Sequence, residues 1–592
     1  MILSASGWRK VFAISGDEQD KNPEISEDSV KISVVAANVF FDYIQQITNQ
    51  ENPVIAVGMD SRPTGPAIAD GMLRALVTKG AIIQYCGVSS APEIMAFSKK
   101  LDGFIYISAS HNPIGHNGIK FGTNDGGVLN AQENSKLIAK FNEILKDDDL
   151  VQKLVTKAFS CSSSELKTVY QTRDSSKFNA LNSYKEFAKE TITGTNNKEY
   201  QNDFFQILNN YISENPIGVV CDFNGSSRVQ SIDKDFFREN KINFYSINES
   251  QIVHEIIPEA ENLCYVQQEM ERLQQEGHKE VVLGYMPDCD GDRGNIVYWD
   301  DKAKKAVILK AQEVFSLSVL AELTYSIWQN SNNKNQSPND FKPAVAVNCP
   351  TSMRINEIVE TLGGTLFRAE VGEANVVNLA REKRAEGYTI RILGEGSNGG
   401  TITYPAAVRD PLNTIFAIIK LLLLKDNGLF ELWCKKAKIN YDSNFTLTDI
   451  LETLPKYTTT GVSEPRAILK VKETDNAKLK ANFQKVFEKQ WNSKKSELNK
   501  SFGICSYEAI ITNGTKEQKN ISDFSLSKNG GLKILFKDKD ENPIAEEVME
   551  KEDIFKDFDE DEGLDDDFDE EDDDFGDDFD DFEEEDMEGG EF

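Results

Sequence analysis

The sequence lacks several features that would assign it to common protein classes. Its eight cysteines include no C-x-x-C pair, so a zinc site or a dithiol redox centre has no support and reduced thiols are expected. The most apolar run, Ile415 to Leu424, is too short and too interrupted by lysine to span a bilayer. The start MILSASGWRK lacks the basic and then apolar order of a signal peptide. These absences predict a cytoplasmic protein without a membrane partner.

Positive charge is also scarce. The chain has 65 Lys and Arg against 98 Asp and Glu, a formal charge of -33. Residues 551–592 hold 26 acidic residues and two lysines, so they carry -24 and residues 1–550 carry only -9. A mildly acidic body argues against non-specific nucleic-acid binding, because that needs Lys and Arg to neutralise phosphates. Any phosphate must therefore bind in a local basic pocket.

The order of apolar segments predicts several α/β units, since 592 residues are too many for one core. Short β-branched runs such as PVIAVGMD alternate with helical patterns, which is typical of βαβ units. We expect three consecutive α/β domains with mixed sheets, a smaller α+β fourth domain and a disordered acidic tail. The predicted boundaries are 1–182, 183–306, 307–435, 436–548 and, for the tail, 549–592.

Local composition adds four finer predictions. Residues 157–201 are rich in Ser, Thr, Asn and Lys and should contain a linker, and residues 329–339 should form a polar surface loop. An amphipathic helix is expected near 475–500 and a strand at 530–538. The tail interleaves seven Phe with its acidic residues, and its protein partners are left open.

The first motif with chemical content is ISASHNPIGHNGIKF, residues 107–121. It follows a predicted strand, so it should lie at the carboxyl edge of a parallel sheet, where α/β folds bind ligands. It supplies the Ser110 hydroxyl as a nucleophile, the His111 imidazole nearby, and the Lys120 amine, which could transfer a proton if its pKa were lowered. A shorter S-x-N-P string would more often be an ordinary turn.

The second motif is PDCDGDRGN, residues 287–295, with carboxylates at alternate positions Asp288, Asp290 and Asp292. Three hard oxygen ligands suit Mg²⁺, which usually keeps places for phosphate oxygens. A plain acidic turn is the alternative. An EF-hand loop is excluded, because Trp299 stands where a bidentate Glu is needed. A dehalogenase-type phosphatase would have Thr or Val after the glycine, where this chain has Asp292.

The third motif is GEGSNGG, residues 394–400, again after a predicted strand. Its glycines permit close backbone approach, and Glu395 and Ser397 offer an acceptor and a donor to sugar hydroxyls. Gly-rich loops of this kind are more often plain turns, so the motif is weak by itself.

Together, and in this order, the three motifs make the chain resemble the α-D-phosphohexomutase superfamily, which includes phosphoglucomutase and phosphomannomutase. The resemblance covers about residues 1–545. Positions that match the family patterns are Ser6, Gly7, Arg9, Gly58, Asp60, Arg62, Ser110, Asn117, Gly118, Lys120, Asp288, Asp290, Asp292, Arg293, Gly394, Glu395 and Ser397. Two departures are Ala5 in place of Thr and Asn398 in place of Gly.

The resemblance implies a mutase that interconverts hexose 1-phosphate and hexose 6-phosphate, with glucose or mannose as the sugar. Phosphorylated Ser110 would ligate Mg²⁺ together with the three aspartates and would pass its phosphoryl group to the sugar. Glucose 1,6-bisphosphate would serve as intermediate and activator. Lys120 would transfer the proton with His111 nearby. Positive charge would come from Arg9 and Arg293, and the substrate would be bound by Arg293, Glu395 and Ser397.

One family element has no counterpart in this chain. The family's R-x-S-G-T-E-P loop, which binds the non-reacting phosphate, is expected soon after GGLKILFKDKDENPIA and is missing. Two readings follow. Either the chain is an active mutase, or it is a mutase-like binding or regulatory protein with weak or no catalysis.

Overall fold

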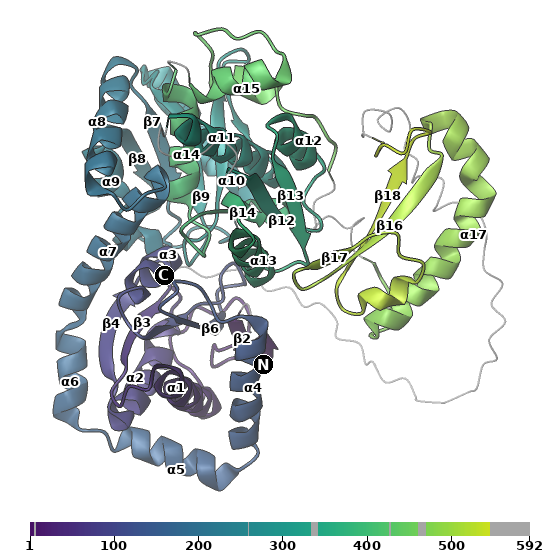
Figure 1. The fold of residues 1–592 in the computed structure, drawn as a ribbon. Coiled ribbons are helices and arrows are strands. Elements are labelled where there is room, and N and C mark those ends of the chain that lie inside the picture. The colour runs from purple at the N-terminus through teal and green to yellow at the C-terminus, as the bar shows by residue number, and fades with distance from the viewer. Residues whose placement is uncertain (5–6, 258–259, 333–340, 426–427, 460–468, 545–592) are drawn as a thin grey trace, which may run out of the picture.

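The computed structural model describes residues 1–4, 7–257, 260–332, 341–425, 428–459 and 469–544. They form four β-sheets from successive parts of the chain. Figure 1 shows the first sheet in the lower part of the view, the second and third sheets above it, and the fourth sheet with one long helix to the side. The predicted α/β class with mixed sheets and a smaller α+β unit is confirmed. The tail at 549–592 and most of the loop at 329–339 lie outside the described residues.

The first sheet has six strands in the order β1-β2-β6-β5-β3-β4. They are β1 (Ile2–Ser4), β2 (Gly7–Val11), β3 (Val54–Met59), β4 (Ile82–Val88), β5 (Gly103–Ile107) and β6 (His116–Thr123). β3 pairs in parallel with β4 and β5, whereas β6 runs antiparallel to β5 and β2, so the sheet is mixed. The helices of this unit are α1 (Glu27–Thr48), α2 (Gly65–Lys79), α3 (Ala91–Ser98) and α4 (Ala131–Leu145). The β5–β6 connection therefore starts at the carboxyl end of a parallel strand.

Residues 157–201, which the sequence predicts to contain a linker, are instead mainly helical. The helices are α5 (Asp148–Phe159), α6 (Ser163–Gln171), α7 (Arg173–Thr193) and α8 (Lys198–Glu214). Two of the polar residues are helix caps: Ser162 accepts from the backbone of Glu165, and Asn197 accepts from that of Tyr200. On α7 a buried face repeats every four residues, at Ala180, Tyr184, Ala188 and Ile192. The linker prediction is wrong because the polar composition was interpreted as a loop, whereas the polar residues include helix caps and the apolar residues of α7 form one buried face.

The second and third sheets are also mixed, and their strand orders are β11-β10-β9-β7-β8 and β13-β12-β14-β15. Their strands are β7 (Gly218–Asp222), β8 (Asn243–Ile247), β9 (Val281–Pro287), β10 (Gly294–Asp300), β11 (Lys305–Ile308), β12 (Pro343–Asn348), β13 (Thr365–Ala369), β14 (Thr389–Glu395) and β15 (Gly400–Thr403). Their helices are α9 (Asp233–Glu239), α10 (Ala260–Glu276), α11 (Ala311–Asn332), α12 (Arg354–Thr361), α13 (Glu373–Ala385), α14 (Pro411–Leu423), α15 (Leu429–Ala437) and α16 (Leu447–Glu452). The β9–β10 and β14–β15 turns hold the second and third sequence motifs.

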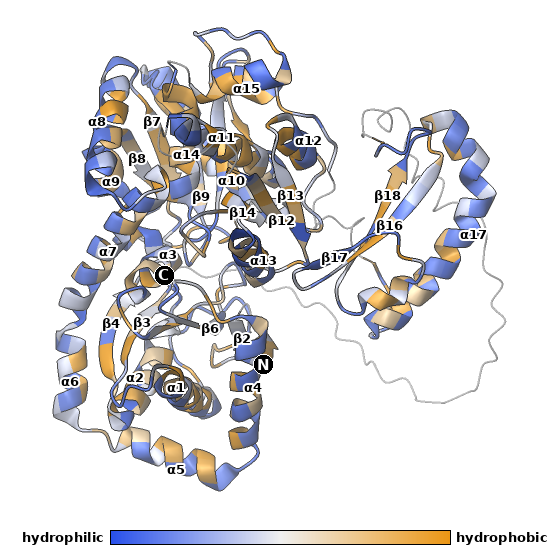
Figure 2. Ribbon diagram, viewed as in Figure 1, coloured by the Kyte–Doolittle hydropathy of each residue, from blue (hydrophilic) through white to orange (hydrophobic). Residues whose placement is uncertain are grey.

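The fourth sheet is a small antiparallel one, β17-β16-β18, covered by α17. Its elements are β16 (Ser506–Asn513), β17 (Lys516–Gln518), β18 (Gly531–Lys537) and α17 (Asn476–Phe502). The predicted helix near 475–500 and strand at 530–538 are confirmed. Trp491 on α17 stacks on Phe536 of the sheet at 6.1 Å between ring centroids. Figure 2 shows the apolar colouring of β16 and β18 beside the mainly hydrophilic α17. The turn at Gly514 contacts Glu370 of the third unit twice. The Gly514 carbonyl accepts from the Glu370 backbone N–H, and the Gly514 N–H donates to the Glu370 carboxylate.

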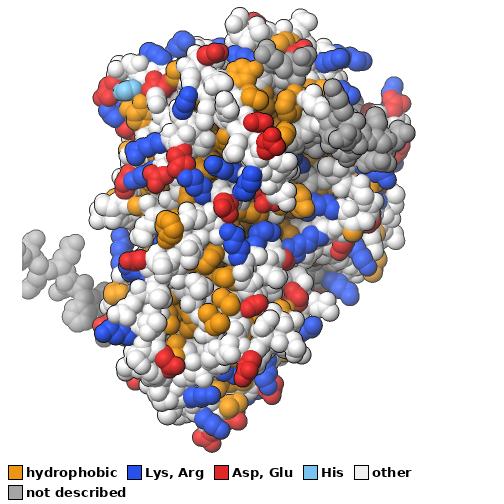
Figure 3. Space-filling model, turned by 60° about the vertical axis from the view of Figure 1, so that its left-hand side comes forward, with side chains coloured by type: hydrophobic (Ala, Val, Ile, Leu, Met, Phe, Trp, Pro, Cys, Tyr) orange, Lys and Arg blue, Asp and Glu red, His pale blue; other side chains and the backbone are white. Residues whose placement is uncertain are grey.

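Surface properties match a mildly acidic body. Among the described residues, no helix is both long and apolar enough to cross a bilayer. On the face in Figure 3, acidic and basic side chains are interspersed over the surface. Positive charge on that face is therefore distributed among negative charge.

A buried ion cluster joins α7 to the third unit. Glu322 on α11 accepts from Arg391 at 2.5 Å and from Lys420 at 2.6 Å. The two cations also donate to the carbonyls of Thr191 and Ile192 in the last turn of α7. Because these donors satisfy carbonyls that the helix end leaves unbonded, the cluster caps α7 and anchors it to α11, β14 and α14.

We expect Glu322→Ala to lower the free energy of unfolding by about 3–5 kcal/mol, because it leaves two cations buried without their carboxylate. Urea denaturation followed by tryptophan fluorescence measures this change. The control is Asp28→Ala, which removes the exposed partner of Lys31 and should leave the unfolding curve unchanged. Equal curves for both variants would contradict the assignment of the cluster as a structural anchor.

Candidate phosphoryl-transfer site

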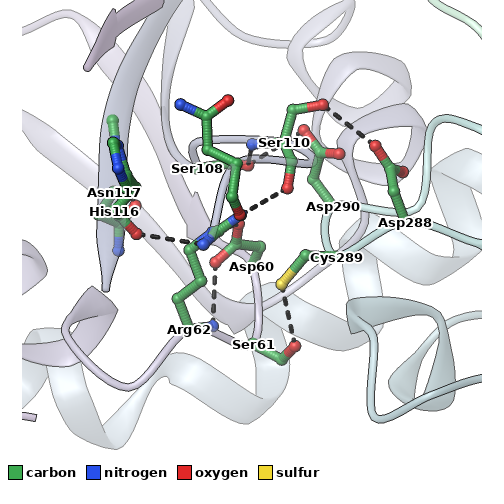
Figure 4. A network of polar contacts seen from close by, with 12 residues as sticks. Asp60, Ser61, Arg62, Ser108, Ser110, His116, Asn117, Asp288, Cys289 and Asp290 are labelled. Carbon is green, nitrogen blue, oxygen red and sulfur yellow. Dashed lines mark hydrogen bonds and ion pairs between the residues drawn. The ribbon is translucent and has the colours of Figure 1, made fainter. Parts of the chain in front are cut away.

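Residues 108–116, called the serine loop from here on, turn sharply at Ser110. Ser110 has a φ of 56°, in the left-handed region, and is 2% exposed. Its backbone N–H donates to the Ser108 hydroxyl at 2.8 Å. Its own hydroxyl donates to Oδ2 of Asp288 at 3.0 Å, as Figure 4 shows. A non-glycine residue in this conformation carries strain that the surroundings must hold, and such strain is common at functional sites.

Arg62 holds the serine loop from behind. Its guanidinium donates to four backbone carbonyls, those of Ser110, Asn112, Pro113 and His116, at 2.5–3.2 Å. Asp60 fixes the direction of the guanidinium by accepting from its Nε at 3.1 Å. Both side chains are fully buried. Since a planar guanidinium presents its donors in a fixed fork, this contact sets the path of the loop and hence the position of the Ser110 hydroxyl.

Residues 288–292 form the acidic loop, in the turn between β9 and β10. One ligand oxygen each of Asp288, Asp290 and Asp292 lies within 4.8 Å of the others, and all three side chains are buried. Burial and the two neighbouring carboxylates raise the pKa of Asp288 well above its usual range. Burial would also raise the pKa of Asp290, but Lys120 and a hydrogen bond from Ser108 outweigh it and hold that pKa below its usual range.

The acidic loop fits a divalent cation. Oδ1 of Asp290 and Oδ1 of Asp292 are buried and have no hydrogen-bond partner among the described residues. A buried carboxylate oxygen without a partner is costly, and it is the kind of hard ligand that Mg²⁺ prefers. The Ser110 hydroxyl adds a fourth oxygen beside Asp288. These residues would hold such an ion, which when bound would supply positive charge beside the Ser110 hydroxyl.

Lys120, on β6, is paired with the acidic loop. Its ammonium lies 2.7 Å from Oδ2 of Asp290 and the residue is 7% exposed. Burial would lower the pKa of Lys120, but Asp290 and Asp292 outweigh it, so the pKa is raised. The lowered pKa that the sequence argument required is therefore not found, and Lys120 is held as a cation.

Three further residues predicted from the sequence, Arg293, Arg9 and His111, lie near the acidic loop. Arg293 donates its backbone N–H to Oδ1 of Asp288 at 3.1 Å. Arg9, on β2, lies opposite Gly118 of β6 and interacts electrostatically with Asp290. Burial, together with nearby Arg293, lowers the pKa of His111 to about 3. His111 is therefore a neutral imidazole at ordinary pH.

Sequence reasoning missed Arg409 and Glu373. Arg409 contacts Asp292 at 2.7 Å and Glu373 at 3.0 Å. Burial raises the pKa of Glu373 to about 7. The sequence around each of these two residues has a feature that could have identified it. Arg409 stands in R-D-P directly before the most apolar helix. Glu373 follows Gly372, whose φ of 122° marks a turn at the start of α13.

Glu395 is the last residue of β14 and Ser397 lies in the turn that follows it. The side-chain amide of Asn348, at the end of β12, donates to Oε1 of Glu395 at 3.1 Å and to the Ser397 hydroxyl at 3.4 Å. The Gly372 N–H also donates to Glu395, at 2.7 Å. Glu395 is thus tied to the turn that carries Glu373, so the third motif reaches the acidic loop through Glu373 and Arg409.

The fold is that of a chain of α/β units with a strained serine, three carboxylates and several cations at adjoining sheet edges. Residues 15–148 match the family model for phosphoglucomutase/phosphomannomutase alpha/beta/alpha domain I, and residues 321–437 match domain III. Two parts of the chain are therefore similar to domains of the phosphoglucomutase/phosphomannomutase family.

Individual relatives match over shorter parts or at low identity. The phosphoglucosamine mutase of Staphylococcus carnosus is 33% identical over 97 residues, 16% of this chain and 22% of that protein. The match thus spans about a fifth of that relative. A phosphoglucomutase/phosphomannomutase family protein from Burkholderia thailandensis is 15% identical, with a TM-score of 0.47, over 77% of this chain and 80% of that one. N-acetylphosphoglucosamine mutase of Aspergillus fumigatus, solved with glucose 1,6-bisphosphate, is 12% identical, with a TM-score of 0.36, over 85% and 97%.

Single aspartate substitutions should separate charge repulsion from cation binding. We expect Asp288→Asn to raise the melting temperature of the metal-free protein, because it replaces the carboxylate whose charged form is disfavoured by burial and by its two neighbours. Asp290→Asn should lower it, because Lys120 loses its carboxylate. Mg²⁺ at 100 times its dissociation constant should stabilise the protein with an intact site by about 2.7 kcal/mol and so raise its melting temperature. Both variants should show a smaller rise.

Differential scanning fluorimetry at a series of Mg²⁺ concentrations measures both effects. Asp235→Asn, an exposed carboxylate on α9, is the control and should respond to Mg²⁺ as the unchanged protein does. An equal Mg²⁺ response in all three variants would show that the acidic loop is not the cation site.

Proposed function

We propose that this chain is a phosphohexomutase that interconverts hexose 1-phosphate and hexose 6-phosphate of glucose or mannose through phosphorylated Ser110. One observation carries the proposal: the Ser110 hydroxyl lies 3.0 Å from Asp288, inside a loop of three buried carboxylates. A serine in an ordinary turn has no reason to face such a loop. The family domain that contains Ser110 supports the same conclusion.

In the proposed reaction a hydroxyl of the bound sugar phosphate attacks the phosphorus on Ser110. The new P–O bond forms to the sugar oxygen while the bond to Ser110 Oγ breaks, which produces a hexose 1,6-bisphosphate. Lys120, kept charged by Asp290, gives a proton to the departing Ser110 oxygen and recovers the proton of the sugar hydroxyl. The bisphosphate then turns over, and its other phosphate returns to Ser110 by the same steps in reverse.

Positive charge for the transferred phosphate comes from Arg9 and Arg293, and Arg409 joins them on Asp292. His111, neutral and without a partner on Nδ1 among the described residues, adds one donor or acceptor at the serine. Glu395 and Ser397 bind sugar hydroxyls in this proposal, with Asn348 fixing their orientation. The residues of the three motifs thus have separate tasks.

The second candidate is a mutase-like binding protein with weak or no catalysis, which the missing R-x-S-G-T-E-P loop favours. Both candidates use the same cations to bind a sugar phosphate. They differ in turnover, because only a mutase must hold the bisphosphate while it reorients.

We expect the unchanged protein to form glucose 6-phosphate from glucose 1-phosphate when primed with glucose 1,6-bisphosphate and Mg²⁺. Ser110→Ala should lower the rate by several orders of magnitude, because it removes the group that carries the phosphate. A dehydrogenase-coupled assay measures the rate, and intact mass with peptide mapping locates the phosphate. Mannose and glucosamine 1-phosphates, assayed by chromatography of the products, test the sugar.

The matched control is Ser61→Ala, a nearby serine whose hydroxyl contacts the Cys289 thiol and, among the described residues, no carboxylate. It should keep the activity and the phosphate on Ser110. Full activity in Ser110→Ala would overturn the proposal. Tight binding of glucose 1-phosphate without turnover would support the binding-protein candidate.

A further inference from the structure

Behind the acidic loop lies a set of buried polar residues that the proposed reaction does not use. They come from separate elements and are at most 3% exposed: Tyr184 of α7, Arg228 of the short 3-10 helix Ser227–Gln230, Asp233 of α9, Tyr285 of β9 and Asp410 before α14. Burying a guanidinium and two carboxylates is costly unless every charge is paired and hydrogen-bonded. The contacts of Arg228 meet that condition.

Arg228 is at the centre of this set. Its Nε donates to both oxygens of Asp233 at 3.0 Å. One terminal nitrogen donates to Oδ1 of Asp410 at 3.3 Å and the other to the hydroxyl of Tyr184 at 3.0 Å. Tyr184 in turn donates to Asp410 at 2.8 Å. The guanidinium is therefore fixed in one plane by two carboxylates and a phenol.

The same guanidinium reaches the acidic loop directly. It donates to the carbonyl of Gly291 at 3.1 Å, and Gly291 lies between Asp290 and Asp292. Gly291 has a φ of 72°, and a Cβ at this position would stand 2.4 Å from Cγ of Arg228. The backbone of the loop thus lies flat against the arginine side chain. Glycine is required there both by the conformation and by the closeness of Arg228.

A second route leads from Arg228 to the carboxylates through Asp410. Asp410 caps α14 by accepting from the backbone N–H of Leu412 at 2.9 Å. The preceding residue is Arg409, whose guanidinium lies 2.7 Å from Asp292. Fixing Asp410 therefore also fixes the backbone from which Arg409 extends. Arg228 therefore acts on the acidic loop in two ways: directly, through the Gly291 carbonyl, and indirectly, through Asp410 and the Arg409 that contacts Asp292.

We propose that Arg228 is a positioning residue, which sets the spacing of the acidic-loop carboxylates for a divalent cation and makes cation binding depend on the contact between the second and third units. This inference rests on the proposed function only in assigning the cation to phosphoryl transfer. Groups that orient metal ligands from outside typically change metal affinity by about 10-fold to 100-fold when altered.

A purely structural role predicts a different outcome. If Arg228 only pairs buried charges, its loss should lower stability and leave the affinity of the remaining folded protein for Mg²⁺ unchanged. The distinguishing measurement is therefore the Mg²⁺ dissociation constant, obtained without substrate from the dependence of the melting temperature on Mg²⁺ concentration.

The test compares two tyrosines of the full chain that each donate one hydrogen bond to a carboxylate next to Arg228. Tyr184→Phe removes the hydroxyl that links Arg228 to Asp410. Tyr285→Phe removes the one that contacts Asp233 at 2.7 Å, a carboxylate that is bonded to Arg228 Nε and not to the nitrogen that contacts Gly291. We expect Tyr184→Phe to weaken Mg²⁺ binding by about 10-fold. Tyr285→Phe should leave it unchanged for a similar loss of stability.

Arg228→Lys provides a second variant, because it keeps the charge and loses the fork that contacts Gly291 and Asp410 together. It should weaken Mg²⁺ binding at least as much as Tyr184→Phe. In the mutase assay both variants should lower kcat at fixed Mg²⁺, with recovery at high Mg²⁺ and little change in KM for the sugar phosphate.

The outcomes separate the two proposals. Unchanged Mg²⁺ affinity in folded Arg228→Lys and Tyr184→Phe would overturn the positioning role whether or not the unchanged protein is a mutase. Weakened Mg²⁺ binding in a protein without mutase activity would uphold the positioning role and remove the proposed function. Equal weakening in Tyr285→Phe would also overturn the proposal, since it would show general loosening.

Discussion

The concentration of negative charge in the acidic loop is the constraint on which the rest of the site depends. Three carboxylates within 4.8 Å of one another, all buried, repel strongly, because little solvent is present to screen them. The fold offsets this repulsion with cations on other elements: Lys120 on Asp290 and Arg409 on Asp292. Asp288 has no such cation in direct contact among the described residues and instead faces the Ser110 hydroxyl, and its raised pKa reflects this difference.

This charge balance joins parts of the chain that are far apart in sequence. Lys120 belongs to the first sheet, the carboxylates to the second, and Arg409 to the segment after the third. Each is at the edge of its own unit, and each has its charge partner on a neighbouring unit. The site is therefore an interface, and its geometry depends on how the units pack. The Glu322 cluster at the end of α7 stabilises the same arrangement at a distance from the chemistry.

Much of the site could be predicted from short strings of residues. Ser110 and the three aspartates each belong to one turn between two strands, so the local sequence carries their identity and their place at a sheet edge. The helix at 475–500 and the strand at 530–538 have clear periodicity. Arg409 was missed because its significance arises from contact with Asp292, 117 residues away in sequence, and Glu373 because its significance arises from contact with Arg409. The linker prediction at 157–201 was wrong because the buried face of α7 has one apolar residue every four positions, and polar residues fill the positions between them.

By itself, the sequence determined the class of fold and the identity of the candidate site residues, Ser110 and the three aspartates, because the residues of each motif are neighbours in the chain. Only the tertiary structure decided the protonation and orientation of those groups. The pKa of Lys120 is the clearest case: burial alone would lower it, and the sequence argument needed that outcome, but Asp290 at 2.7 Å raises it. Electrostatic effects depend on distance and burial, and neither exists until separate units pack together.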